Sequence, residues 1–196
     1  MTSQRPLFDL PESASARYNV FLGIFPDRPA AERSVERAVR IREKLGLRGR
    51  IRPVDHLHVT LHFLGRRAAV PPELMAAMER IGASAATEVP AFDVELDRVI
   101  GFQNRRREGP VVLSCADEAN ASLRELQRTL GEGLAREGIR MARARFVPHL
   151  TLLYDRRRIR EEMVEPVRWR VEDVVLVRSE VGATKYVELG RWGLRG

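Results

Sequence analysis

The sequence predicts an α+β protein built around an antiparallel sheet. Strand-like and helix-like segments follow one another without the regular strand–helix–strand alternation that builds a parallel sheet. Two of the strand-like segments, around His58 and around His149, share the pattern histidine, apolar residue, threonine, leucine. A repeat at this separation predicts two lobes of sheet and helix, related by a pseudo-twofold axis around a central cleft.

The first half of the chain is predicted to hold a flexible arm, three strands and two helices. Apolar residues at helical spacing, such as Val35, Ala38 and Leu45, indicate a helix that ends at Gly46. The pair Pro71 and Pro72 is typical of the start of a second helix. We expect an arm over residues 1–16, strands over 18–25, 55–65 and 92–102, and helices over 30–45 and from 71 to about 84.

The second half is predicted to hold one long helix and four strands. Leucines recur on one face between residues 118 and 137, which indicates a helix that Asp117 caps. An arginine-rich hairpin precedes the strand at 111–115, and a short turn or helix is expected at Glu161 and Glu162. The remaining strands are expected over 142–154 and, as a closing hairpin, over 169–181 and 184–194.

Composition describes a globular protein without a membrane span. Hydrophobic residues make up 44% and charged residues 31% of the 196 positions, and no apolar run approaches the roughly 18 residues that cross a bilayer. The N-terminus lacks a secretory signal pattern, and the single cysteine, Cys115, cannot form an internal disulfide. We therefore expect a cytoplasmic protein with no membrane partner.

The formal net charge of +7 is carried almost entirely by arginine, because Lys44 and Lys185 are the only lysines. Arginine forks suit phosphate, so this surface favours anionic partners. A coding bias toward arginine on a solvated surface would produce the same composition, and the two explanations remain open. The arginine runs at 105–107 and 156–158 could bind a phosphate backbone or be solvated loops.

Three of the four histidines lie at alternate positions in one expected strand. His56, His58 and His62, with Thr60, would share one strand face, while Leu57, Val59, Leu61 and Phe63 would face the core. In the second repeat the same alternation predicts a polar face with Arg145, Val147, His149 and Thr151, and a buried face with Phe146, Pro148, Leu150 and Leu152.

Two histidines and two threonines across one cleft fit phosphodiester hydrolysis. One imidazole can take a proton from attacking water while the other protonates the departing sugar oxygen. Threonine hydroxyls can donate to the phosphate oxygens, where charge builds up. This chemistry needs no metal and no other cofactor; a metal bound by His56, His58 and His62 is the alternative.

The two motifs resemble those of the two-histidine (2H) phosphoesterase superfamily, in its LigT-like branch of RNA 2′,3′-cyclic phosphodiesterases, also called 2′-5′ RNA ligases. The segments "LHVTLHFLG" and "RFVPHLTLLYD" match the two motifs with their flanks, and "YNVFLGIFPD" and the closing hairpin match the ends. The resemblance covers roughly residues 17–194. It implies a bilobal α+β fold, with residues 17–196 as one domain. We expect a monomer, because the duplicated lobes already supply the cleft.

The resemblance also implies which residues act. His58, Thr60, His149 and Thr151 would be catalytic, and water would open a 2′,3′-cyclic phosphate to a 2′-phosphate. By analogy His149 would be the base and His58 the acid, an order that nothing in the sequence fixes and that the reverse, ligase reaction would exchange. The substrate would be RNA with a cyclic phosphate end or a small nucleotide.

One position departs from the family pattern. Many relatives carry arginine five residues after the second histidine, where this chain has Tyr154. Phosphate affinity or substrate preference is therefore expected to differ, and Arg145 is the candidate replacement for the missing charge. Phe21 and Phe102 are candidates for stacking on a nucleobase, or for core packing.

Two alternatives to this function stay open. A different substrate with the same chemistry, such as a 2′-5′ oligoadenylate or ADP-ribose cyclic phosphate, is the first. A non-catalytic RNA-binding module that uses the basic cleft is the second.

Overall fold

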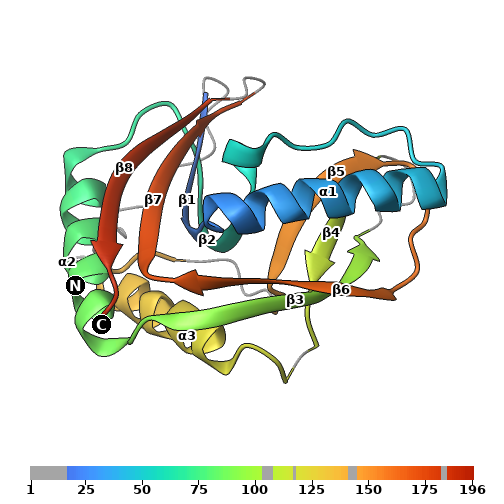
Figure 1. Cartoon of the computed structure of the whole chain (residues 1–196). Coiled ribbons are helices and arrows are strands. Elements are labelled where there is room, and N and C mark those ends of the chain that lie inside the picture. The colour runs from blue at the N-terminus through green and yellow to red at the C-terminus, as the bar shows by residue number, and fades with distance from the viewer. Residues whose placement is uncertain (1–16, 103–107, 117, 141–144, 182–184) are drawn as a thin grey trace.

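The computed structural model describes residues 17–102, 108–116, 118–140, 145–181 and 185–196. These residues form an antiparallel sheet with strand order β6-β3-β4-β5-β2-β1-β7-β8, together with α-helices (Figure 1). The α+β class and the antiparallel sheet are thereby confirmed. The strands are β1 (Tyr18–Ile24), β2 (Val59–Arg67), β3 (Phe92–Gly101), β4 (Gly109–Ser114), β5 (His149–Asp155), β6 (Glu162–Val171), β7 (Asp173–Glu180) and β8 (Tyr186–Gly193). The helices are α1 (Arg28–Leu45), α2 (Pro72–Glu88), α3 (Ala121–Arg136) and the 3-10 helix η1 (Val54–His56).

The sheet has two four-stranded halves that meet at one point. Among the described residues, β2 and β5 pair only through Val59 and Leu150. On either side of this pair the order is alike: the strand with the histidine motif comes first, and three antiparallel neighbours follow outward. The junction of the two halves is therefore where the two motifs meet.

The helices connect the two halves rather than covering one each. Helix α1 follows β1 in the chain but packs against β5 and β6 of the other half. Helix α3 follows β4 but packs against α2 and contacts β2 as well as β3. Helix α2 packs against β7 and β8 of its own half. As a result, the two halves share one large apolar core. None of the described helices is both long and apolar enough to cross a membrane.

Helix ends differ from the predicted ones by a few residues. Helix α1 begins at Arg28 because the Asp27 carboxylate accepts a hydrogen bond from the Ala30 amide at 2.7 Å, and Pro29 is tolerated in the first turn. Helix α2 runs to Glu88 instead of 84, and α3 begins at Ala121 instead of 118. The predicted arm at 1–16, the arginine run at 105–107 and the cap at Asp117 lie outside the described residues.

The turn or helix predicted at Glu161 and Glu162 is wrong, because Glu162 begins strand β6. Pro166 argues against a strand in the sequence, because proline has no amide hydrogen to donate to a neighbouring strand. The structure accommodates it because β6 is an edge strand whose pairing with β3 is irregular between Met163 and Val167. Beyond the irregularity, Val167, Trp169 and Val171 alternate inward as buried residues.

A buried carboxylate at the end of β5 holds the loop that leads toward η1. The Asp155 side chain accepts hydrogen bonds from the backbone amides of Arg48 at 2.7 Å, Gly49 at 3.0 Å and Arg157 at 2.8 Å. Burial acts to raise the pKa of this carboxyl, but these amides outweigh it and leave the pKa below its ordinary value. Asp155 thus fixes the chain segment that carries Arg48, Arg50 and Arg52.

Replacing Asp155 with asparagine should lower the free energy of unfolding at pH 7 by about 2 kcal/mol, since amide bonds to a charged acceptor are lost. The contribution is present above the ordinary carboxyl pKa and is lost as the pH falls through the lower folded-state value. Denaturant unfolding of the wild type and of Asp155→Asn between pH 7 and pH 3 measures this difference in the free energy of unfolding. Asp93→Asn is the matched control, because Asp93 is exposed and lies 3.8 Å from Arg170. Equal losses in the two variants would contradict the role of Asp155.

Candidate active site

A cleft of about 490 Å³ opens over the junction of β2 and β5. Its lining includes both motif pairs, His58 with Thr60 and His149 with Thr151. Because β2 and β5 run antiparallel through Val59 and Leu150, continuing that register brings Thr151 opposite His58 and Thr60 opposite His149. Val59 and Leu150 themselves point into the core and are fully buried. The four polar residues predicted to meet therefore do so.

Both imidazoles are held by the same local hydrogen bond. The Nδ1 atom of His58 lies 2.9 Å from the carbonyl of His56, and that of His149 lies 2.7 Å from the carbonyl of Val147. A carbonyl can only accept, so Nδ1 carries the proton in each ring. The neutral form of each histidine therefore has an unprotonated Nε2, which is free to accept or, once protonated, to donate.

His58 lies in the more apolar surroundings of the two. Its ring stacks on Phe21 with centroids 4.7 Å apart and meets the edge of Tyr186 at 5.5 Å. This burial, and to a lesser extent the nearby Arg52 cation, lowers the pKa of His58 to about 4. His58 is therefore neutral at pH 7 in the free protein. Among the described residues, the aromatic neighbour of His149 is Phe102, whose ring is edge-on at 5.0 Å.

A β-bulge follows the threonine in each motif strand. Along β2, Thr60 pairs with Gly23 and His62 with the next residue, Leu22, so Leu61 is an extra residue. Along β5, Thr151 pairs with Val112 and Leu153 with Val111, so Leu152 is extra in the same way. A bulge shifts the side-chain alternation by one position. The two motifs therefore repeat in local structure as well as in sequence.

The bulge overturns the prediction that His62 shares a face with His58. His62 is buried, and its Nε2 lies 2.7 Å from the carbonyl of Gln127 in α3. Phe63, predicted to face the core, is 48% exposed and lines the cleft instead. The set of three histidines suggested as metal ligands is therefore not formed, and the described residues contain no group of three histidine, cysteine or acidic side chains placed to hold a metal.

The strands also begin later than predicted. His56 belongs to η1, and β2 starts at Val59, yet His56 still borders the cleft, where its ring stacks on Tyr186 at 4.6 Å. Strand β5 starts at His149, so Arg145 precedes it and the alternation that placed Arg145 beside His149 does not apply. Arg145 is exposed and is not among the residues that line the cleft.

Of the other predicted contact residues, two line the cleft and one packs against a cleft histidine. Tyr154 lines the cleft and is 46% exposed. It follows the bulge in β5 as Phe63 follows the bulge in β2. Phe21 also lines the cleft, but it is buried with Val175 and Val177 beneath His58. Phe102 touches the ring of His149 without lining the cleft.

Two cleft residues that bond each other were missed in the sequence. Arg52 lines the cleft, and its guanidinium donates to the Tyr186 hydroxyl at 3.3 Å. Arg52 comes from an irregular segment before η1, where no periodicity marks it, and Tyr186 from the outermost strand of its half. Among the described residues, the arginine that lines this cleft is therefore Arg52, not Arg145.

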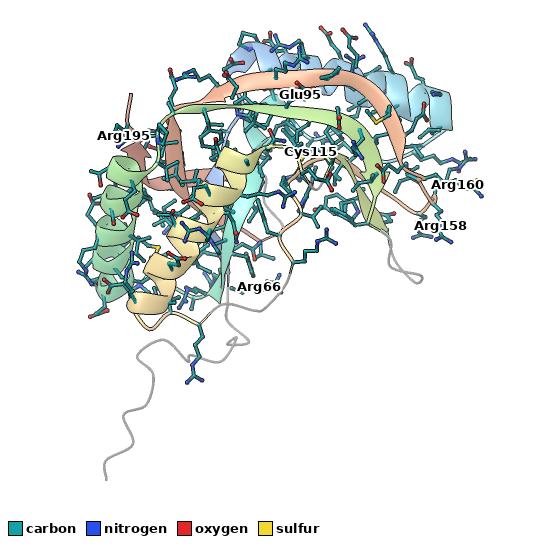
Figure 2. The ribbon with its side chains drawn as sticks, turned by 90° about the horizontal axis from the view of Figure 1, so that it is seen from below. Arg66, Glu95, Cys115, Arg158, Arg160 and Arg195 are labelled. Atoms are coloured by element: carbon teal, nitrogen blue, oxygen red, sulfur yellow. The ribbon has the colours of Figure 1, made fainter. Side chains whose placement is uncertain are left out.

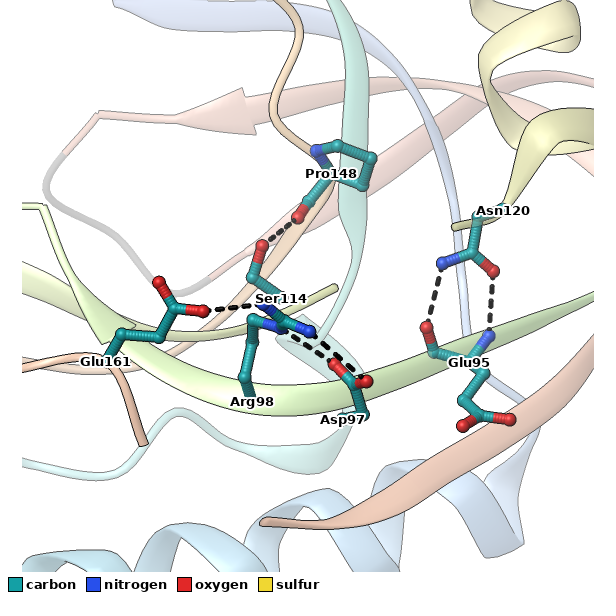
Figure 3. Close-up of polar contacts among 7 residues, drawn as sticks. All are labelled: Glu95, Asp97, Arg98, Ser114, Asn120, Pro148 and Glu161. Carbon is teal, nitrogen blue, oxygen red and sulfur yellow. Dashed lines mark hydrogen bonds and ion pairs between the residues drawn. The ribbon is translucent and has the colours of Figure 1, made fainter. Parts of the chain in front are cut away.

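The entry to β5 is fixed by a buried hydroxyl. The Ser114 side chain donates to the carbonyl of Pro148 at 2.7 Å, directly before His149 (Figure 3). The Ser114 contact therefore positions the second histidine through the backbone. Farther from the cleft, Asn120, directly before α3, bonds the backbone of Glu95 on β3 in both directions, at 2.8 and 2.9 Å.

Comparison with known proteins finds one family and several similar structures. The family described as the 2′-5′ RNA ligase superfamily matches residues 25–183. TT0787 of Thermus thermophilus is 25% identical over 91% of this chain and 98% of its own, with a TM-score of 0.72. LigT of E. coli, solved in complex with 3′-AMP, is 26% identical over 92% and 99%, with a TM-score of 0.70. Usb1 of Kluyveromyces marxianus, 13% identical over 92% and 99% with a TM-score of 0.52, shares the fold alone. No curated protein sequence matches the chain.

The surroundings of His58 predict its titration. Its ring should protonate with a pKa near 4, and its neutral form should carry the proton on Nδ1. Long-range ¹H–¹⁵N NMR spectra recorded between pH 3 and pH 8 measure both properties, and the loss of signals in His58→Gln assigns the ring. A midpoint near the ordinary value of about 6.5, or a neutral ring protonated on Nε2, would contradict the described environment.

Proposed function

This chain belongs to the 2′-5′ RNA ligase superfamily, and we propose that it hydrolyses the 2′,3′-cyclic phosphate of RNA ends or nucleotides to a 2′-phosphate without a metal. Family and fold support a phosphodiesterase. The observation that carries the proposal is the pair of imidazoles, each with Nδ1 bound to a carbonyl two residues earlier and each lining one cleft. Such a pair can move two protons across a single phosphorus.

In the proposed reaction, water attacks the phosphorus and the 3′ oxygen of the ribose leaves. Water loses a proton to one imidazole and forms a bond to phosphorus, while the bond to the 3′ oxygen breaks. The other imidazole gives its proton to that oxygen, which leaves as a hydroxyl. Thr60, Thr151 and Arg52 would donate to the phosphate oxygens as negative charge increases there.

The order of the two histidines is assigned from their surroundings. The resemblance implies His149 as base and His58 as acid. His58 has a pKa lowered to about 4 and is neutral at pH 7, ready to accept a proton. We therefore assign His58 as the base and His149 as the acid in hydrolysis, the reverse of the implied order.

The proposal also covers the substrate, the oligomeric state and the cellular location of the protein. E. coli LigT has been solved with 3′-AMP and with NADP⁺, and a nucleotide of this kind fits a cleft with the aromatic residues Phe63 and Tyr154 at its walls. Another 2′-linked or cyclic nucleotide is the second candidate, because Tyr154 stands where many relatives carry arginine. The protein would act as a monomer in the cytoplasm, with residues 17–196 as one domain.

Removal of either imidazole tests the proposal. His58→Ala and His149→Ala should each lower kcat for an oligonucleotide with a 2′,3′-cyclic phosphate end by roughly 10²–10⁴-fold, because each removes one proton transfer. Thr60→Ala and Thr151→Ala should lower it less. The assay contains EDTA, and the product is identified as a 2′-phosphate by chromatography against both isomers.

The matched control is His62→Gln, which removes a third imidazole but keeps a donor for the Gln127 carbonyl. It should retain activity, and all variants should unfold at similar temperatures. Cyclic phosphate left intact by the wild type, or activity that zinc restores after EDTA, would exclude the proposed reaction. RNA binding with no hydrolysis of any cyclic or 2′-linked nucleotide would favour the non-catalytic module.

The assignment of acid and base has its own test. A p-nitrophenyl phosphodiester releases a leaving group that needs no proton, so loss of the acid should matter little and loss of the base should still be severe. His149→Ala should therefore recover at least about 10-fold of its defect on this substrate, and His58→Ala should not. Recovery by His58→Ala instead would restore the order implied by the resemblance.

A further inference from the structure

Two further hollows continue from the cleft along the same side of the molecule. The first, of about 690 Å³, shares Arg52 and Tyr154 with the cleft. The second, of about 430 Å³, shares Arg157 with the first. We call the two hollows together the arginine track. Its arginines are Arg48, Arg50, Arg52, Arg156, Arg157, Arg158 and Arg160.

Four carboxylates line the arginine track, and three of them bond to groups other than its arginine side chains. Asp155 is engaged by backbone amides, Glu161 bonds Arg98 at 2.5 Å (Figure 3), and Glu162 bonds Lys44. Glu108 lies 3.5 Å from Arg156. Within the described part of the chain, the exposed side chains of Arg48 and Arg50 form no ion pair.

Some arginines elsewhere on the surface pair with acidic neighbours. Arg128 pairs with Glu125 and Glu132, and Arg191 pairs with Glu188 and Asp173. In the track, by contrast, seven arginines face four carboxylates, so the lining carries a net positive charge. In Figure 2, Arg158 and Arg160 project from the side of the molecule opposite Arg195. The excess of arginine in the track begins next to the cleft, since Arg52 lines both.

Tyr154 marks the passage from cleft to track. Its exposed side chain lines both the cleft and the first hollow, so a base that leaves the cleft can stack there while its phosphate reaches Arg52 or Arg50. A chain of phosphates with unpaired bases has the charge and the aromatic surface that this passage accommodates.

We propose that the arginine track binds the single-stranded RNA that precedes the terminal phosphate, so that the protein selects oligonucleotides over mononucleotides. The proposal rests on the proposed function, which places the terminal phosphate in the cleft. It assigns Arg48 and Arg50 to the phosphates of the adjoining nucleotides and Tyr154 to stacking between the two regions.

The test is a binding measurement that does not depend on hydrolysis. The probes are a fluorescein-labelled RNA hexamer that ends in a 2′-phosphate, and adenosine 2′-phosphate. The ratio of their affinities should fall about 10-fold in Arg48→Gln/Arg50→Gln, and the slope of log affinity against log salt for the hexamer should decrease in size by about 1.4, for two lost phosphate contacts.

The matched control is Arg136→Gln/Arg195→Gln, which removes the same charge from exposed positions outside the track and the cleft. It should keep both the ratio and the slope. Equal effects in the two double variants, a hexamer that binds no more tightly than adenosine 2′-phosphate, or equal binding of a hexaglutamate peptide would each overturn the proposal. A wild type that binds the hexamer but opens no cyclic phosphate would reject the proposed function and leave the track supported.

Discussion

The candidate site depends on one cross-strand contact, the pairing of Val59 with Leu150. This is where two four-stranded halves meet, and both side chains are buried in the shared core. Because neighbouring residues of a strand point to opposite faces, burial of these two forces His58 and His149 to the other side. The antiparallel direction then sets each histidine against the threonine of the other strand. Apolar packing on one face of the sheet thus determines the arrangement of protons and hydroxyls on the other.

The second constraint is the bulge after each threonine. Because the alternation shifts after Thr60 and Thr151, Phe63 and Tyr154 face the cleft in place of His62 and Leu153. An extra leucine in each strand remains buried, so the core loses nothing by the shift. The result is a cleft with a polar floor and exposed aromatic residues beside it, which suits a phosphate that carries a nucleoside. The two halves differ around their histidines: among the described residues, Phe21 and Tyr186 pack on the ring of His58, and Phe102 packs on that of His149. The burial on the first side lowers the pKa of His58.

Much of this could be predicted from the sequence, and the failures share a cause. The fold class followed from the irregular order of strand-like and helix-like segments, and the meeting of His58, Thr60, His149 and Thr151 from a period-two pattern that is repeated with its flanks. His62 and Phe63 were placed on the wrong faces because a bulge is set by the pairing with β1, which no local pattern encodes. Strand β6 was missed because Pro166 argues against a strand unless its edge position is known. Arg52 lies in an irregular segment whose course depends on a carboxylate far away in the chain, Asp155.

The position of β1 in the sheet has a consequence for synthesis on the ribosome. This strand lies between β2 and β7, so one of its edges has no partner until residues 173–180 have been made. The half formed by β3, β4, β5 and β6 has all its strands earlier, by residue 171. We expect the nascent chain to assemble that half first and to hold β1 with an unsatisfied edge, a state prone to association with other chains. The slow step would then be the capture of the earliest strand by the latest ones, as non-local pairings are costly to close.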